Sequence, residues 1–266
     1  MIIVKIGGGI SINIEGIIKG LSEIEEQFII IHGANSLRDE LAQSLGREKK
    51  ILTSIKGYSS VYSDKNAIEL LYMSYAGLGN KRIVETCQKY GINAVGLTGL
   101  DGKLIQGKRN SGIRVIENGK KKIKHDMSGK PQSINKELLT ILLENGYTPV
   151  ITVPIIDETN NAINSENDDI VVVFQESLNV ETIIFLIEAP GLLKDSTNEE
   201  TLIKQLSIKE LEKYEADATG RIKRKYHALW KISQLGTKKI IISDGRIKNP
   251  IQEAFLEKGT IISVVD

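Results

Sequence analysis

The chain has 266 residues, of which 41% are hydrophobic and 26% are charged, and these proportions exclude a disordered or fibrous protein. Its 35 basic and 34 acidic residues leave a net charge of +1, which excludes binding to nucleic acid through overall charge. The single cysteine rules out an intramolecular disulfide, and no run of about 20 apolar residues lacks charge. With no signal-peptide pattern, we expect a cytoplasmic protein that makes no use of a membrane.

The first half of the chain alternates β-branched runs with amphipathic stretches. This order predicts strands over residues 1–6, 28–31, 94–96 and 148–153, and helices over residues 14–26, 36–45, 67–90 and 133–145. Strands that are separated by helices lie parallel in a sheet with helices on both faces. The predicted fold is therefore α/β, a three-layer αβα sandwich with a mainly parallel central sheet.

An antiparallel excursion interrupts this alternation between residues 102 and 130. Two short runs, 113–117 and 121–124, flank Asn118-Gly119, and this dipeptide is a strong hairpin signal. The remaining elements are predicted as helices over residues 169–178, 222–236 and 250–258, strands over residues 182–187, 240–243 and 260–265, and a loop over residues 194–204. We expect one continuous fold with two lobes, residues 1–175 and 176–266.

A glycine-rich turn follows the first strand, where Lys5-Ile6 precedes Gly7-Gly8-Gly9. Glycines let backbone N–H groups come close to an anion, and the lysine adds positive charge. The spacing is neither that of a Walker A loop nor that of a dinucleotide-binding strand turn. We favour phosphate binding over a purely structural turn.

The second strand ends in another turn of small residues, Gly33-Ala34-Asn35. Open α/β sheets bind ligands at the carboxyl ends of their strands. Two neighbouring strand ends are therefore placed to hold two reactants, although a simple turn before a helix remains equally acceptable.

Two charged clusters open later helices. Residues 164–169 read Asn-Ser-Glu-Asn-Asp-Asp, which is more acid than helix capping requires. Residues 220–225 read Gly-Arg-Ile-Lys-Arg-Lys, and cations are unfavourable at a helix N-terminus unless an anion faces them. No aromatic residues are interleaved for base stacking. We favour a site role for the first cluster and phosphate contact for the second, against capping and a solvated basic turn.

Taken in order, these clusters resemble the amino acid kinase superfamily over essentially the whole chain. Residues 70–84 (LLYMSYAGLGNKRIV), 93–102 (NAVGLTGLDG), 220–225 (GRIKRK) and 244–251 (DGRIKNPI) are most similar to one subgroup of its acetylglutamate kinase branch, the LysW-aminoadipate or LysW-glutamate kinases. The resemblance implies a phosphotransferase that uses ATP with Mg²⁺. Its acceptor would be the distal carboxylate of an amino acid whose amino group is attached to a small acidic carrier protein, in lysine or arginine biosynthesis. It also implies a homodimer.

The resemblance assigns roles to particular residues and lobes. Lys5 and Lys225 would neutralise the transferring phosphoryl group, and Asp168 would orient them. The implied substrate-binding residues, in the first lobe with the dimer contact, are Gly33, Ala34, Val61 and Asn164. The implied nucleotide-binding residues are Lys5, Gly7, Gly8, Glu188 and Lys225, with the second lobe holding most of the nucleotide. A carboxylate acceptor is already ionised at neutral pH, so no general base is required.

Three positions depart from the family pattern. Val61 stands where relatives usually place an arginine for the substrate's α-carboxylate, and no apolar side chain replaces a bidentate guanidinium. Ala34 replaces the second glycine of a Gly-Gly pair, and Glu188 replaces an aspartate near the nucleotide. Either another residue compensates for Val61 or the acceptor differs.

Several alternatives stay open. The lysines at 120–122 and 124 beside the predicted hairpin turn could receive an acidic carrier or could simply be solvated. A free acetylglutamate or acetylaminoadipate kinase and a nucleotide-binding regulatory paralogue are the competing functions. Aminoadipate and glutamate differ by one methylene, which a pocket distinguishes by only about 1–3 kcal/mol.

Overall fold

Eight strands form the central sheet of the protein, whose computed structural model describes residues 1–47, 49–55, 57–117 and 119–263. The strand order is β14-β16-β15-β13-β1-β2-β10-β5. These strands are β1 Ile2–Ile6, β2 Phe28–His32, β5 Ala94–Thr98, β10 Thr148–Thr152, β13 Thr182–Ile187, β14 Gln205–Leu206, β15 Lys239–Asp244 and β16 Thr260–Ser263. All neighbours pair in parallel except β15 and β16, which confirms the predicted mainly parallel sheet.

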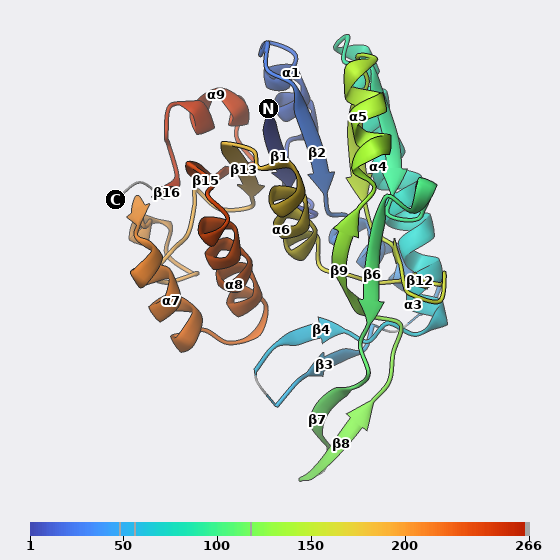
Figure 1. Ribbon diagram of the computed structural model, residues 1–266. Coiled ribbons are helices and arrows are strands. Elements are labelled where there is room, and N and C mark those ends of the chain that lie inside the picture. Colours follow the sequence, from blue (N-terminus) through green and yellow to red (C-terminus); the bar gives the residue numbers. More distant parts are fainter. Residues whose placement is uncertain (48, 56, 118, 264–266) are drawn as a thin grey trace.

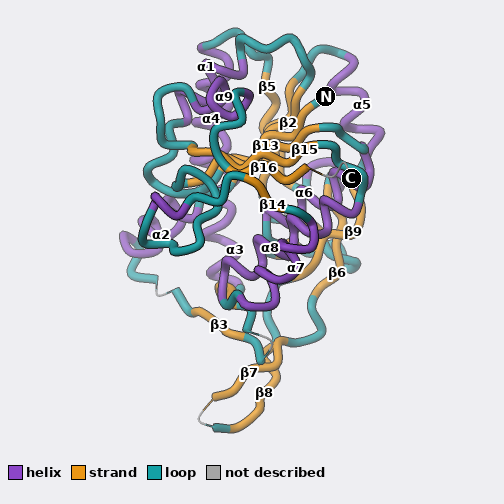
Figure 2. The backbone as a smooth tube through the Cα atoms, turned by 90° about the vertical axis from the view of Figure 1, so that its left-hand side faces the viewer, coloured by secondary structure: helices purple, strands orange, loops and turns teal. Residues whose placement is uncertain are grey.

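Helices cover both faces of this sheet (Figure 2). On one face lie α1 Ile14–Leu21, α4 Asn80–Lys89 and α9 Pro250–Phe255, and on the other lie α5 Lys136–Glu144, α6 Asn167–Leu178, α7 Ile208–Asp217 and α8 Gly220–Gln234. Side chains alternate along each strand, so in β1 Ile3 enters one core while Val4 and Ile6 enter the other. This is the three-layer αβα sandwich that the alternation of elements predicts.

Smaller sheets and hairpins extend from the carboxyl ends of the parallel strands. One sheet has the order β12-β11-β6-β9, from β6 Ile105–Arg109, β9 Gly129–Ile134, β11 Ile155–Ile156 and β12 Ala162–Ile163. Two hairpins, β3 Ile51–Thr53 with β4 Ser59–Val61 and β7 Ile113–Glu117 with β8 Lys120–Lys124, lie together at one end of the molecule (Figure 1). The predicted β7–β8 hairpin is confirmed, and Asn118 of its turn lies outside the described residues.

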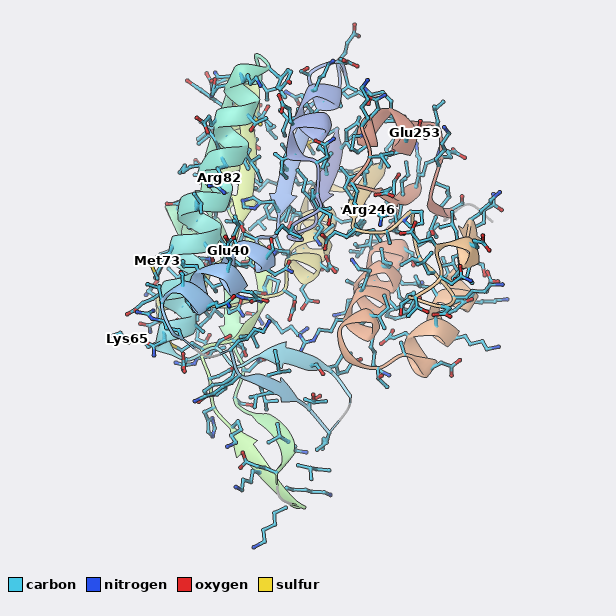
Figure 3. The ribbon with its side chains drawn as sticks, turned by 180° about the vertical axis from the view of Figure 1, so that it is seen from behind. Glu40, Lys65, Met73, Arg82, Arg246 and Glu253 are labelled. Atoms are coloured by element: carbon cyan, nitrogen blue, oxygen red, sulfur yellow. The ribbon has the colours of Figure 1, made fainter. Side chains whose placement is uncertain are left out.

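A long helical rod connects the β3–β4 hairpin to β5. It consists of α3 Lys65–Leu71, the π-helix η1 Tyr72–Gly79 and α4, and Lys65, Met73 and Arg82 mark its course in Figure 3. The single helix predicted over residues 67–90 is therefore one rod with a π-helical middle. Wide turns of this kind occur often at functional sites.

Some predicted boundaries are wrong for local reasons. The helix predicted from residue 133 starts at Lys136, because residues 133–134 extend β9 and Asn135 caps α5 by accepting a hydrogen bond from Leu138 N at 3.1 Å. The helix predicted over residues 14–26 ends at Leu21. The strand predicted over residues 260–265 is observed to Ser263, and residues 264–265 lie outside the described part.

The β3–β4 hairpin and helix α7 are absent from the sequence-based prediction. The helix predicted over residues 36–45 is observed as α2 Asn35–Ser44, which begins one residue earlier. The proposed lobe boundary at residue 175 falls inside α6. Strand β13, which follows it, pairs directly with β1, so the two parts share one sheet. Their division into an acceptor lobe and a nucleotide lobe stays a prediction.

Candidate active site

Lys5 stands near the carboxyl end of β1, in the middle of the sheet. Its neighbours across the sheet are Ile31 of β2 and Phe185 of β13. The side chain is almost fully enclosed, and its Nζ lies 3.0 Å from Oδ1 of Asp168. A buried ammonium group of this kind requires a counter-ion, because an unpaired buried charge is very costly.

Asp168 joins Lys5 to a second lysine. It lies in the first turn of α6, and its Oδ2 is 3.5 Å from Nζ of Lys225 on α8. Helices α6 and α8 run side by side against the sheet (Figure 1). Burial opposes ionisation of Asp168, but Lys225 and Lys5 outweigh it and hold the pKa of its carboxyl well below the usual range. Burial lowers the pKa of the Lys225 ammonium, and Asp168 partly offsets this.

These three residues, which we call the transfer centre, carry two positive charges against one negative charge. The three residues come from three different elements, and the one carboxylate holds both ammonium groups in place. The remaining positive charge favours an anion beside them. The predicted catalytic residues therefore come together.

The two glycine turns touch each other beside the transfer centre. A methyl group added at Gly8 would lie 2.6 Å from the backbone nitrogen of Ala34, and one added at Gly33 would lie 3.0 Å from the backbone nitrogen of Gly8. The backbone N–H of Ser36 donates to the carbonyl oxygen of Gly8 at 2.9 Å. Both turns need glycine for this close approach, and both strand ends border one site.

A cavity of about 280 Å³, here called the inner cavity, opens over the transfer centre. Seven of the predicted site residues line it: Lys5, Gly8, Gly33, Val61, Asn164, Asp168 and Lys225. Three further lining residues each have a buried polar atom with no hydrogen-bond partner among the described residues. These atoms are Ser165 Oγ, Asn167 Oδ1 and Arg224 Nε. Such groups are available to hydrogen-bond with a ligand or with ordered water, because leaving them unpaired destabilises the protein.

The other three predicted residues lie behind or beside this cavity. Ala34 is the residue that directly precedes α2, and its side chain is buried. The backbone N–H of Gly7 donates to the carbonyl oxygen of Leu186 at 2.8 Å, and Glu188 accepts from the backbone N–H of Ser11 at 2.8 Å. Gly7 and Glu188 thus lie on the β13 side of the glycine turn, away from Val61 and Asn164.

A model of the family described as "Amino acid kinase family" matches residues 1–244. This chain belongs to that family. It is 36% identical to the LysW-aminoadipate kinase of Thermus thermophilus over 98% of this chain and 100% of the relative. It is 34% identical to the LysW-aminoadipate kinase of Deinococcus radiodurans over 99% of this chain and 91% of the relative. Both the suspected family and its carrier-dependent subgroup are therefore supported.

A solved structure, the N-acetylglutamate synthase of Neisseria gonorrhoeae, superposes on this amino acid kinase with a TM-score of 0.78. The match covers 98% of this chain and 59% of that chain at 16% identity. At this identity the likeness concerns the fold alone. It confirms the predicted sandwich architecture.

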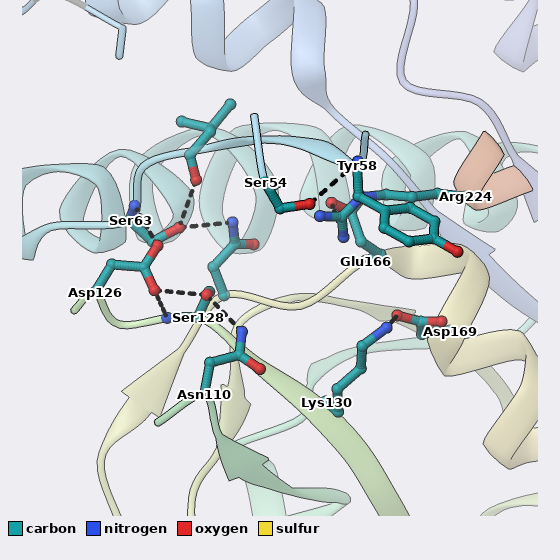
Figure 4. A network of polar contacts seen from close by, with 12 residues as sticks. Ser54, Tyr58, Ser63, Asn110, Asp126, Ser128, Lys130, Glu166, Asp169 and Arg224 are labelled. Carbon is teal, nitrogen blue, oxygen red and sulfur yellow. Dashed lines mark hydrogen bonds and ion pairs between the residues drawn. The ribbon is translucent and has the colours of Figure 1, made fainter. Parts of the chain in front are cut away.

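A second, larger cavity of about 630 Å³, here called the outer cavity, adjoins the inner one in this kinase. The two share Val61, Asn164, Glu166 and Arg224 among their lining residues. The β3–β4 and β7–β8 hairpins form part of its wall, together with Lys130 (Figure 4). The sequence did not indicate it, because its wall comes from segments far apart in the chain.

Some cations at the basic start of α8 face the two cavities, and others do not. Lys225 and Arg224 face the cavities, whereas Lys223 Nζ contacts the carbonyl oxygen of Ala218 at 3.3 Å. The side chain of Arg221 lies outside the described part of the structure. Two members of the predicted cluster therefore border the site.

No group of three or more His, Cys, Asp or Glu side chains within the described ranges is placed to hold a metal ion. Both oxygens of Asp168 face lysines, so the transfer centre is not itself a metal site. A magnesium ion would fit here only as part of a nucleotide, held by the phosphates.

Every helix in the described ranges is too short or too polar to cross a membrane.

Proposed function

We propose that this amino acid kinase transfers the γ-phosphoryl group of ATP to the distal carboxylate of 2-aminoadipate or glutamate, whose amino group is linked to a small acidic carrier protein. The product is an acyl phosphate for lysine or arginine biosynthesis in the cytoplasm. The observation that carries this proposal is the transfer centre on the floor of the inner cavity, where the two strand-end turns meet. The full-length similarity to carrier-dependent kinases narrows the acceptor.

The chemistry requires alignment and charge neutralisation more than proton transfer. The ionised acceptor carboxylate attacks the γ-phosphorus, the bond from that phosphorus to the β–γ bridging oxygen breaks, and ADP leaves. Lys5 and Lys225 neutralise charge on the transferring oxygens. Asp168 holds the two ammonium groups in register and takes no proton. The glycine turn that follows Lys5 would offer backbone N–H groups to the phosphates.

The two substrates are assigned to opposite sides of the glycine turn. ATP lies on the side of Gly7 and Glu188, over the second lobe, and the acceptor lies in the inner cavity by Gly33, Val61 and Asn164. Mg²⁺ bound to ATP supplies further neutralisation of the β- and γ-phosphates.

The outer cavity, of about 630 Å³, has the size of a ligand pocket, and several cations lie along its wall. Arg114, Lys130 and Lys231 belong to its lining, and the adjoining β8 exposes Lys120 and Lys121. An acidic carrier would be attracted to this surface and oriented by it. We therefore assign the outer cavity and the β7–β8 hairpin to carrier docking.

A homodimer is proposed on the helical rod. Tyr72, Met73 and Leu78 leave 42%, 40% and 44% of their surface exposed, and Met73 is seen on the rod in Figure 3. Exposed apolar side chains in one segment favour contact with another protein surface. Analytical ultracentrifugation tests this proposal: Met73→Asp should shift a wild-type dimer to monomer, and a monomeric wild type would reject it.

An ATP-consumption assay with three acceptors tests the function. Carrier-linked 2-aminoadipate and carrier-linked glutamate should each support faster turnover at low concentration than free N-acetylglutamate, because the carrier contributes binding energy remote from the reacting carboxylate. Equal efficiency with free N-acetylglutamate would favour a free-acid kinase. Nucleotide binding without turnover on any acceptor would favour a regulatory paralogue.

A further inference from the structure

Position 61 leaves part of the proposed acceptor without a partner. An amino acid linked through its amino group keeps two carboxylates, one that reacts and one that does not. Val61 lines both cavities but has only an apolar side chain to offer. A second carboxylate that is enclosed without a charged or hydrogen-bonding partner would weaken binding severely.

Arg224 lies where the two cavities meet and has hydrogen-bonding capacity to spare. Its Nη1 is 3.2 Å from Oε1 of Glu166, and its Nε is buried with no hydrogen-bond partner among the described residues. It directly precedes Lys225 of the transfer centre on α8. A carboxylate bound to Arg224 would therefore be close to the phosphoryl-transfer position without occupying it.

We propose that Arg224 binds the non-reacting carboxylate of the acceptor, replacing the arginine that position 61 lacks, and that Glu166 holds the guanidinium until the acceptor arrives. This inference rests on the proposed function and adds the residue that selects the acceptor. A guanidinium matches a carboxylate in a two-pronged geometry that a lysine cannot reproduce. Glu166 is itself a carboxylate, and its ion pair with Arg224 runs through Nη1 alone, which leaves the Nε side of the guanidinium for the acceptor.

Aromatic and acidic neighbours keep the guanidinium in position. Cζ of Arg224 lies 5.8 Å from the centre of the Tyr58 ring, which is within the range of a cation–π contact. The Tyr58 hydroxyl donates to Glu215 at 3.2 Å, and this fixes the ring against the helical side of the site. Figure 4 shows Arg224, Tyr58 and Glu166 gathered at one end of the polar network.

Two other cations near the site are less suited to this role. Arg38 lines the inner cavity, but its Nε and Nη2 both donate to Asp39, at 2.9 and 2.7 Å. Lys130 lines the outer cavity and pairs with Asp169 at 2.7 Å. Arg224 combines a place in both cavities with a buried, unpaired N–H group.

The first test separates acceptor binding from turnover. Arg224→Met should raise the KM for carrier-linked 2-aminoadipate by about 10- to 100-fold, as expected for the loss of a charge-assisted hydrogen-bonded pair, with a smaller effect on the KM for ATP. Glu166→Gln should lower the acceptor KM, because it removes the competing carboxylate. Arg47→Met is the matched control, since Arg47 pairs with Glu69 at 3.1 Å outside both cavities.

Arg224→Met could also disturb the neighbouring Lys225, so a second test changes the acceptor in place of the protein. Carrier-linked 5-aminopentanoate retains the reacting carboxylate and lacks the other one. The wild type should bind it about as weakly as Arg224→Met binds the normal acceptor, and the substitution should cause little further loss with this analogue. A full additional loss would overturn the inference.

A rescue variant completes the design. Val61→Arg in the Arg224→Met background should restore the acceptor KM to within several-fold of the wild type, because position 61 also borders both cavities. An unchanged acceptor KM in Arg224→Met, with an active wild type, would overturn this inference and leave the proposed function intact. A wild type that phosphorylates no carrier-linked acid would reject the proposed function itself.

Discussion

The transfer centre and the two hairpins beside the outer cavity, β3–β4 and β7–β8, which we call the rim, use charge in different ways. Lys5, Asp168 and Lys225 come from three elements separated by long stretches of chain, and each is largely enclosed. On the rim, Lys122 and Lys124 of β8 pair with Glu117 on the adjacent strand, and all three are substantially exposed. Enclosed charges depend strongly on their partners, whereas exposed pairs contribute about 0–1 kcal/mol. The centre is therefore suited to chemistry and the rim to partner encounter.

The largest effect is expected from removing either lysine of the transfer centre. Lys5→Ala or Lys225→Ala should lower kcat by about 10²-fold or more, because each ammonium group stabilises charge in the transition state. Steady-state assays with carrier-linked acceptor measure this, and Lys19→Ala on the exposed side of α1 is the control. Near-normal turnover in both variants would contradict the assignment.

Asp168 provides the next test, because it acts on the lysines and not on a proton. Asp168→Asn should lower kcat by about 10- to 100-fold through misplaced ammonium groups. The lysines hold the pKa of this carboxyl well below its usual range, so it stays ionised at every pH above about 4. Any stability from this ionisation is present above the ordinary carboxyl pKa and is lost only as pH falls through the lowered one.

The pH–rate profile checks that role. Between about pH 5 and pH 9 the wild type should show no step that belongs to Asp168. A step in this interval that disappears in Asp168→Asn would mean that the carboxylate exchanges a proton during turnover.

The buried residue His32, at the end of β2, leads us to predict a pH effect on stability. His32 is fully buried, lies beside the carbonyl of Gly33 and contacts Asn80. Burial lowers its pKa from 6.5 to about 4. The unfolded chain therefore binds a proton more readily between these values, so the free energy of unfolding should fall by up to about 3 kcal/mol as pH drops from about 6.5 to 4.

Chemical denaturation at several pH values measures this loss. His32→Gln should remove the part of the pH dependence that lies in this interval, whereas His125→Gln, at an exposed position, should leave it in place. The same slope in the wild type and in His32→Gln would assign the effect to other groups.

The sequence predicted the centre better than the rim for a physical reason. Apolar runs and glycine turns specify parallel strands locally, so Lys5 and Gly33 could be placed at neighbouring strand ends before the structure was known. Charge at a helix start marked Asp168 and Lys225. The roles inferred for these residues stay predictions.

The rim depends on contacts that no local pattern encodes. The backbone N–H of Ile55 donates to the carbonyl oxygen of Arg114 at 2.9 Å, and this joins the two hairpins across a long separation in the chain. Strand β3 has only three residues, which is too short for a periodic signal. Arg224 was one of four cations in the basic cluster, and its distinct contact with Glu166 became visible only in three dimensions.

The smallest effect is expected on the rim itself. Lys120→Glu and Lys121→Glu should together raise the apparent KM for carrier-linked acceptor by about 2- to 10-fold, while kcat and the KM for ATP change little, because exposed charges mainly alter the rate of encounter. Both side chains are exposed on β8. The wild-type advantage should shrink as salt rises, since the Debye length is about 8 Å at physiological ionic strength.

A control with the same change in net charge separates docking from general electrostatics. Lys19→Glu with Lys238→Glu alters exposed positions near the amino ends of the parallel strands, at the far end of the molecule from the β7–β8 hairpin (Figure 1). This control should leave the acceptor KM close to that of the wild type. If both double variants raise the KM equally, overall charge governs the encounter and the hairpin has no special part in it. If neither double variant raises the acceptor KM, and free N-acetylglutamate is phosphorylated efficiently, the lysines of the rim are simply solvated. The rim would then have no part in acceptor binding, whereas the transfer centre would keep its part in catalysis.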